Sequence, residues 1–141
     1  MRTAARVFVG ALAVVAAAAR AGDTAPLDVH GLWRIDQAMR EPILDRSHAR
    51  IDFGADGHLG GHTSSNSMAA SYTLDGTALR IGPIKLTTQA RCSRLQLEQE
   101  DRILTALEHS VSARVRDDGI VELRDRDGRG MLRGTRFTED R

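Results

Sequence analysis

Apolar and polar residues alternate in short runs over most of the chain, which is the period of strands that bury one face. Such runs lie at residues 49–53, 70–74, 79–81, 111–115 and 121–123. Asp-Gly dipeptides separate or follow them, at Asp56-Gly57, Asp75-Gly76, Asp118-Gly119 and Asp127-Gly128. Asp-Gly suits the type I′ turn, which requires positive φ at both central residues. The pattern therefore predicts a hairpin at each dipeptide and about eight antiparallel strands.

An antiparallel sheet with that many short strands exposes two edges unless it closes on itself. We therefore expect a mainly β (α+β) fold, a small antiparallel barrel, with a two-sheet sandwich as the alternative. Trp33 and Ile35 alternate with polar neighbours, which indicates an opening strand with Trp33 in the core. Residues 37–48 contain Pro42 and several charges and are expected to form a loop.

Residues 87–107 depart from the strand pattern and predict the one helix of the domain. Ser93 and Gln96 have the spacing of a capping box, in which each side chain binds the backbone amide of the other. The helix is expected to end near His109. A lone helix of this length is marginal in water, so it should pack on the hydrophobic surface of the strands.

The apolar positions of this helix recur at steps of seven, three and four, which places them on one face. They are Leu97, Leu104, Leu107 and Val111, with Ile103 beside them. Glu100 and Asp101 interrupt that stripe and are therefore expected to face water.

Residues 1–21 have the organisation of a secretory signal peptide. Arg2 and Arg6 precede an apolar run over residues 7–19, and Ala19-Arg20-Ala21 is a small-residue cleavage site. A transmembrane anchor is the alternative, but this run is short for a bilayer. We therefore expect a periplasmic protein that is cleaved after Ala21.

Cleavage there would leave a linker over residues 22–29 and a single domain over residues 30–141. It would also remove three arginines, so the 20 basic and 19 acidic residues of the whole chain become 17 and 19, a net charge of −2. No basic stripe with interleaved aromatics is present, which argues against nucleic-acid binding. We expect no membrane span after cleavage, no internal disulfide because there is one cysteine, and a monomer.

Several motifs in order resemble the META domain family, which includes the HslJ-type heat-shock proteins of bacteria. The first motifs are a Gly-Leu-Trp strand, the hairpin ARIDFGADGHLGG and a loop that ends at Asn66. The hairpin SYTLDGTALRI, a Thr and a Cys four residues apart, a Glu-x-x-Ile-Leu-x-x-Leu helix and a closing VELRD strand follow in that order. The residues that carry the family motif are Trp33, Asn66, Thr88, Cys92, Glu100, Leu104 and Leu107.

The resemblance implies an exported, lipocalin-like barrel with a helix, linked to heat or antibiotic (novobiocin) stress in the envelope. It implies no catalytic residues and no cofactor. Many relatives have Gly-Cys-Asn in the loop, and that cysteine could pair with the one before the helix. In this chain Ser65 stands in its place, so the pairing that the resemblance implies is lost.

The candidate chemical sites are weak. Cys92 precedes a helix start and is flanked by arginines, which favours a reactive thiolate, but an inert relic of the lost pair is the simpler interpretation. His58, His62 and Cys92 are weak candidates for a metal site, because the glycines between the histidines favour a bulge that would separate them. We therefore predict no catalytic, cofactor or metal residues.

The alternating run of arginine and aspartate from Arg114 to Arg136 is most simply a solvated sheet face with cross-strand pairs. A surface for an acidic partner is the alternative interpretation.

Three functions remain at this point. The leading one is a non-enzymatic module that binds another envelope component. The second is a carrier of a small apolar ligand in the barrel mouth, lined by Trp33 and Tyr72. The third is a thiol switch or enzyme centred on Cys92.

Overall fold

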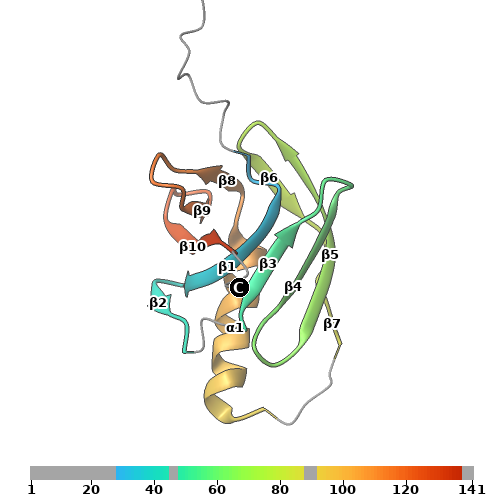
Figure 1. Ribbon diagram of the computed structural model, residues 1–141, viewed down its shortest axis with the longest axis vertical. Helices are drawn as coiled ribbons and strands as arrows, with labels where there is room; N and C mark the ends of the chain where they lie inside the picture. Colours follow the sequence, from blue (N-terminus) through green and yellow to red (C-terminus); the bar gives the residue numbers. More distant parts are fainter. Residues whose placement is uncertain (1–27, 45–47, 88–91, 138–141) are drawn as a thin grey trace, which may run out of the picture.

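The computed structural model describes residues 28–44, 48–87 and 92–137. In these residues eight antiparallel strands close into a barrel, two short strands extend it and one helix packs beside it (Figure 1). The predicted barrel is confirmed in preference to the sandwich. The predicted leader, its cleavage site and Thr88 lie outside the described residues. No helix in the described part is long and apolar enough to cross a bilayer.

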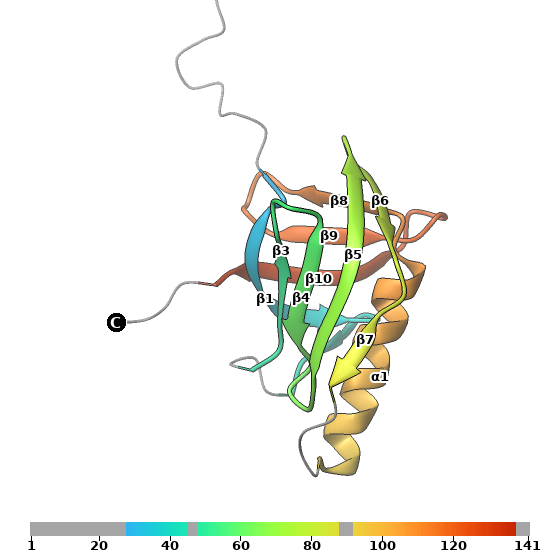
Figure 2. The ribbon, with the colours of Figure 1, turned by 90° about the vertical axis from the view of Figure 1, so that its right-hand side faces the viewer.

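The barrel closes because the first strand pairs with the last. Trp33 lies opposite Arg136 and Ala38 opposite Leu132. The barrel strands are β1 (Gly31–Ala38), β3 (Arg50–Phe53), β4 (His58–His62), β5 (Ser67–Asp75), β6 (Ala78–Ile81), β8 (Ser112–Val115), β9 (Val121–Arg124) and β10 (Gly130–Arg136). Figure 2 shows β8, β9 and β10 crossing the direction of β3, β4 and β5.

Two short strands lie off the closed path. The strand β2 (Glu41–Pro42) pairs with β1, and β7 (Lys85–Thr87) pairs with β5. The expected loop over residues 37–48 is therefore partly wrong. The sequence did not indicate β2 because a proline within a polar run argues against a strand. Pro42 is tolerated here because β2 is an edge strand, where the missing N–H costs no hydrogen bond to a neighbouring strand.

All four predicted hairpins are present, but the predicted type I′ turn is wrong at each of them. The N–H of Gly57 donates to the carbonyl of Gly54 at 3.2 Å, and Gly119 and Gly128 make the equivalent bond. Only the glycine of each Asp-Gly pair has positive φ, as in a type I turn closed by a left-handed glycine. At Gly76 the loop has two residues and positive φ at the first alone, the pattern of a type II′ turn.

Trp33 is fully buried in the core, as predicted. Its indole N–H donates to the carbonyl of Val29 at 2.7 Å, which satisfies its only polar group. The guanidinium of Arg136 lies 3.9 Å from the ring centroid and donates to the carbonyls of Asp28 and His30. The C-terminal strand therefore fastens the segment that enters β1.

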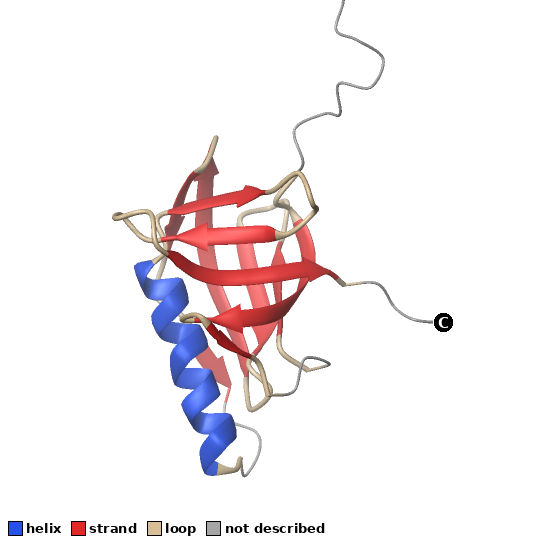
Figure 3. Ribbon diagram, turned by 90° about the vertical axis from the view of Figure 1, so that its left-hand side faces the viewer, coloured by secondary structure: helices blue, strands red, loops and turns tan. Residues whose placement is uncertain are grey.

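The helix α1 (Arg94–His109) begins and ends where the sequence predicts. The hydroxyl of Ser93 accepts from the N–H of Gln96 at 3.2 Å, and the Gln96 side chain accepts from the N–H of Ser93 at 2.9 Å. The helix packs against β1 and β10 along one side of the barrel (Figure 3).

The buried face of α1 differs from the predicted one. Leu97 and Val111 are 49% and 45% exposed, and Leu104 is half-buried. The predicted Ile103 and Leu107 are buried, and Gln99, Glu100 and Ala106 are buried beside them. The spacing of apolar residues did not predict this face because Gln99 and Glu100 form hydrogen bonds with a loop. These bonds offset the free-energy cost of burying two polar side chains.

Candidate functional site

The buried polar side of α1 meets the loop that joins β4 to β5. Glu100 is 8% exposed, and its Oε2 accepts from the hydroxyl of Thr63 at 2.6 Å and from the side-chain amide of Asn66 at 2.8 Å. Thr63 and Asn66 are also buried. The fold thus brings together two family-motif residues, Asn66 and Glu100, and the expectation that Glu100 faces water is wrong.

Gln99 extends this contact to a third segment. Its Nε2 donates to the carbonyl of Thr63 at 3.2 Å and to the hydroxyl of Ser64 at 3.1 Å, and its Oε1 accepts from the N–H of Leu44 at 2.7 Å. We call Thr63, Ser64, Asn66, Gln99 and Glu100 the helix–loop cluster. Its hydrogen bonds run between the loop, the helix and Leu44, so it ties three parts of the chain together.

Ser65 and Cys92 are the positions that the resemblance links through a lost cysteine pair. Ser65 is 4% exposed, and its hydroxyl has no hydrogen-bond partner in the described part of the chain. A thiol in that position would lose little, because sulfur is a weak hydrogen-bonding group. Cys92 is half-buried just before the helix cap and is not in a disulfide.

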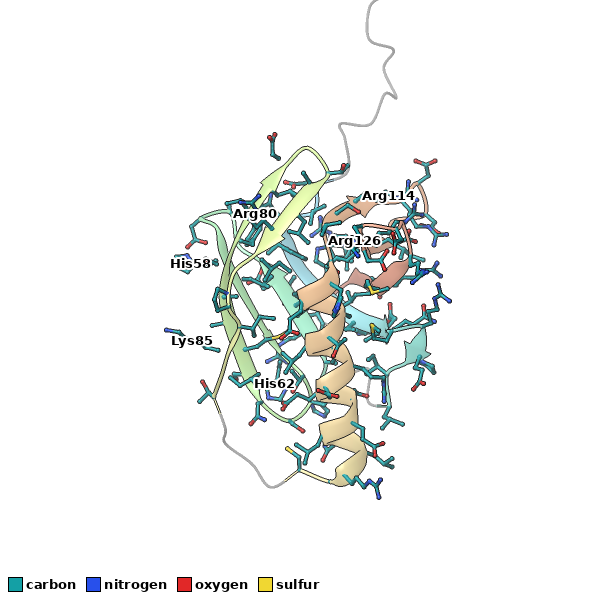
Figure 4. All side chains as sticks on the ribbon, turned by 180° about the vertical axis from the view of Figure 1, so that it is seen from behind. His58, His62, Arg80, Lys85, Arg114 and Arg126 are labelled. Atoms are coloured by element: carbon teal, nitrogen blue, oxygen red, sulfur yellow. The ribbon has the colours of Figure 1, made fainter. Side chains whose placement is uncertain are left out.

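The two histidines of the candidate metal site lie on one uninterrupted strand. β4 pairs with β3 and β5 without a register shift, so the expected bulge at the glycines is wrong. Gly61 is needed for a different reason: a Cβ there would come within 2.4 Å of the carbonyl of Arg50. Four residues of strand separate His58 from His62 by about 13 Å, and Figure 4 shows them well apart.

Each histidine has its own local partner. His58 lies 3.0 Å from the carboxylate of Asp56, and Nδ1 of His62 accepts from the N–H of Ser64 at 3.1 Å. Burial, followed by the charges of Arg50 and His48, lowers the pKa of His62. No three His, Cys, Asp or Glu side chains of the described residues are placed to hold a metal ion.

The aromatic residues proposed to line a ligand cavity take part in the core instead. Tyr72 is buried, and its hydroxyl donates to the carbonyl of Gly54 at 2.5 Å. Its ring meets that of Phe53 edge to face, with 5.3 Å between centroids. Burial is the main cause that raises the pKa of Tyr72.

A second buried carboxylate lies on the outer face of the barrel. Val121 and Leu123 of β9 face the core, so Glu122 between them faces outward, yet its side chain is only 2% exposed. Its cover consists of arginines from three segments, which with Glu122 form what we call the Glu122 cluster: Arg114, Arg116, Arg124 and Arg133.

The geometry of the Glu122 cluster is partly as predicted. Arg114 and Arg133 are cross-strand neighbours of Glu122, which confirms the expected pairs. The face is not simply solvated, because the arginines bury the carboxylate. Burial alone would raise the pKa of Glu122, but the hydrogen bond and charge of Arg124 and the charges of Arg133 and Arg114 outweigh it and lower the pKa.

These features define a class of protein: a small closed antiparallel barrel in which the one helix of the described residues is tied to the β4–β5 loop by buried polar residues. The sequence matches the META domain over residues 25–136, and the chain belongs to the META domain family.

Solved structures share this fold at low sequence identity. A DUF4847 family protein from Bacteroides vulgatus is 15% identical with a TM-score of 0.54, and the match covers 78% of this chain and 94% of that one. A protein from Burkholderia xenovorans solved by NMR is 23% identical with a TM-score of 0.58, covering 80% and 85% of the two chains. These likenesses concern the fold alone. No curated protein matches this sequence at a significant level.

Proposed function

We propose that this META-domain protein is exported to the periplasm and acts there as a non-enzymatic module that binds another envelope component. Binding would support envelope integrity under heat or novobiocin stress. One observation carries the proposal: four of the family-motif residues serve the fold. Asn66 and Glu100 hydrogen-bond to hold the helix to the loop, and Trp33 and Leu107 are fully buried. Recognition of a partner therefore falls to the outer surface of the barrel.

The two alternative functions gain no comparable support. A carrier needs an open barrel, whereas Trp33 and Tyr72 direct their polar groups to backbone carbonyls within the core. A thiol switch would need a base beside Cys92, whereas the two β4 histidines have local partners: His58 pairs with Asp56, and His62 accepts from Ser64.

A deletion strain tests the proposal. We expect it to lose viability under heat or novobiocin, and the full chain to restore viability. A chain that starts at Gly22, without the leader, should fail to restore it although it is produced. Cys92→Ser should restore it fully, whereas failure of this variant would favour the thiol switch. Growth of the deletion strain equal to that of its parent under both stresses would contradict the proposed function.

Crosslinking in intact cells tests the binding part separately. A tagged full chain, crosslinked under stress and purified from the periplasmic fraction, should enrich the same envelope component in repeated experiments. The same yield from a tagged, exported protein of unrelated fold would contradict specific binding.

A further inference from the structure

The Glu122 cluster carries more positive charge than its carboxylate neutralises. Each guanidinium offers five N–H donors, whereas a carboxylate accepts about four hydrogen bonds in all. Arg116 has a second acid, Asp118, at 2.8 Å, but Arg124 and Arg133 pair only with Glu122 among the described residues. Donors of these two arginines therefore remain available to a further anion.

These two arginines line an open groove of about 500 Å³ next to the β9–β10 hairpin. Its lining residues are Gln37, Arg40, Glu122, Arg124, Gly128, Arg129, Gly130 and Arg133. Four arginines face one carboxylate, which leaves three formal positive charges in excess. Arg40 and Arg129 make no ion pair with any described carboxylate. Figure 4 shows Arg114 and Arg126 on the same side of the molecule, away from Arg80 and Lys85.

A strained turn holds Arg40 at this groove. Met39 and Arg40 form the two-residue turn between β1 and β2, with φ of 51° and 67°. Both are bulky residues in a region that favours glycine, which costs free energy. The N–H of Met39 donates to the carbonyl of Met131 at 2.8 Å, so the turn is fixed beside β10. Strain of this kind is concentrated where a side chain must be held for function.

We infer that this groove binds the phosphate group of a phosphate ester. A phosphate monoester carries nearly two negative charges and three acceptor oxygens. Those oxygens suit several converging guanidiniums and the excess positive charge better than a carboxylate, which has one charge and two oxygens. The inference rests on the proposed function of a binding module and names the chemistry of its ligand. Soluble phosphate esters and lipid headgroups share that chemistry.

The primary test is a titration of the purified mature chain with inorganic phosphate at fixed ionic strength, followed by NMR. The Nε–H signals of Arg124 and Arg133 and the amides of Gly128 and Gly130 should shift and saturate. A chain whose signals move no more with phosphate than with an equal charge of chloride would overturn the inference.

A matched pair of variants locates the site. R40Q/R129Q removes two charges from the groove and leaves the Glu122 ion pairs unchanged. The bonds to the carbonyl of Arg40 and from the N–H of Arg129 involve backbone atoms and are retained. R80Q/K85Q removes two charges from β6 and β7, which do not line the groove. We expect the first variant to bind phosphate about tenfold more weakly and the second to bind as the wild type does. Equal weakening in both variants would overturn the inference.

Two further arms separate the possible ligands. Phosphatidylcholine vesicles with and without phosphatidic acid are compared with soluble glycerol 3-phosphate. Groove-dependent binding to the phosphatidic acid vesicles indicates a headgroup, and binding to glycerol 3-phosphate alone indicates a soluble ester; both support the inference. Groove-dependent binding of polyglutamate that is tighter than that of either phosphate ligand would overturn it in favour of an acidic peptide. Because this test uses purified protein, its failure leaves the viability and crosslinking results of the proposed function unaffected.

Discussion

Two glutamates are buried among the residues that the structure describes, and their surroundings differ in charge. Glu100 lies inside the helix–loop cluster, where two neutral side chains, Thr63 and Asn66, donate to the same carboxylate oxygen. Glu122 lies on the outer face of β9 under four arginines. Both carboxylates are almost inaccessible to solvent, with 8% and 2% of each residue exposed.

This difference leads us to assign different roles to the two sites: stability of the fold to the helix–loop cluster, and the inferred phosphate binding to the groove beside Glu122. Around Glu100 two neutral donors from the loop meet one carboxylate oxygen of the helix, and these buried hydrogen bonds contribute to the stability of the fold. Around Glu122 the arginines exceed the carboxylate, and two of them line an open groove. The two carboxylates therefore differ in their surroundings: Glu100 has neutral donors, whereas Glu122 has arginines in excess beside a groove that is open to solvent.

The largest effect is expected from Glu100→Ala. The substitution removes the carboxylate oxygen to which the Thr63 hydroxyl and the Asn66 amide both donate, which should lower the free energy of unfolding by about 3 kcal/mol. Urea denaturation measures it. The control is Glu98→Ala, one position from the buried face and exposed, which should change stability by less than about 0.5 kcal/mol. Similar losses in the two variants would mean that the helix–loop cluster does not support the fold.

Glu122→Gln should lower the free energy of unfolding by a smaller amount, about 2 kcal/mol at pH 7, because the arginine partners of Glu122 are partly solvated. The pKa of Glu122 is lower in the folded chain than in the unfolded chain. Its stabilisation is therefore present above the unfolded pKa, near 4.5, and is lost as the pH falls through the folded value. The gap between wild type and variant in urea denaturation should narrow below pH 4.5. A gap that is constant from pH 7 to pH 3 would contradict this cause.

Arg40→Gly should change stability and binding in opposite directions. Glycine relieves the left-handed strain at φ 67°, and this gain exceeds its entropic cost by about 0.5–1 kcal/mol. The same variant loses one groove charge and should bind phosphate more weakly. Arg40→Gln is the control, since it keeps the strain but loses the charge. If Arg40→Gly is no more stable than Arg40→Gln, strain does not hold the side chain in place.

The smallest effect is expected from Ser65→Ala. The buried hydroxyl has no partner among the described residues, so its removal should stabilise the protein by about 0.5 kcal/mol. Ser64→Ala, which removes the hydroxyl that accepts from Gln99, should instead destabilise it. Thermal unfolding of the two variants compares neighbouring hydroxyls of one loop, and the same sign of change in both would argue against a closed cluster.

The sequence predicted most of the fold because each prediction used local information. Alternation with a period of two gave the strands, Asp-Gly pairs placed the hairpins, and the Ser93–Gln96 spacing placed the helix start. The turn type was missed because three of the turns begin before the Asp-Gly pair, so that only the glycine needs positive φ.

The site was harder to predict because it depends on contacts between distant segments. No neighbouring residues in the sequence indicate that Thr63, Gln99 and Glu122 are buried. Their burial depends on the loop after β4 and on the register of β8, β9 and β10. The order of motifs indicated Asn66 and Glu100 as family residues but not that they touch. The Arg40 turn was hidden in a run that resembles a loop.

The most direct measurement is the rise in Tm on adding phosphate at constant ionic strength. A ligand that binds only the folded chain raises Tm. We expect the same rise in the wild type and in Glu100→Ala, although the variant starts from a lower Tm, and almost no rise in R40Q/R129Q. An equal rise in R40Q/R129Q, or its loss in Glu100→Ala, would contradict the assignment of phosphate binding to the groove beside Glu122.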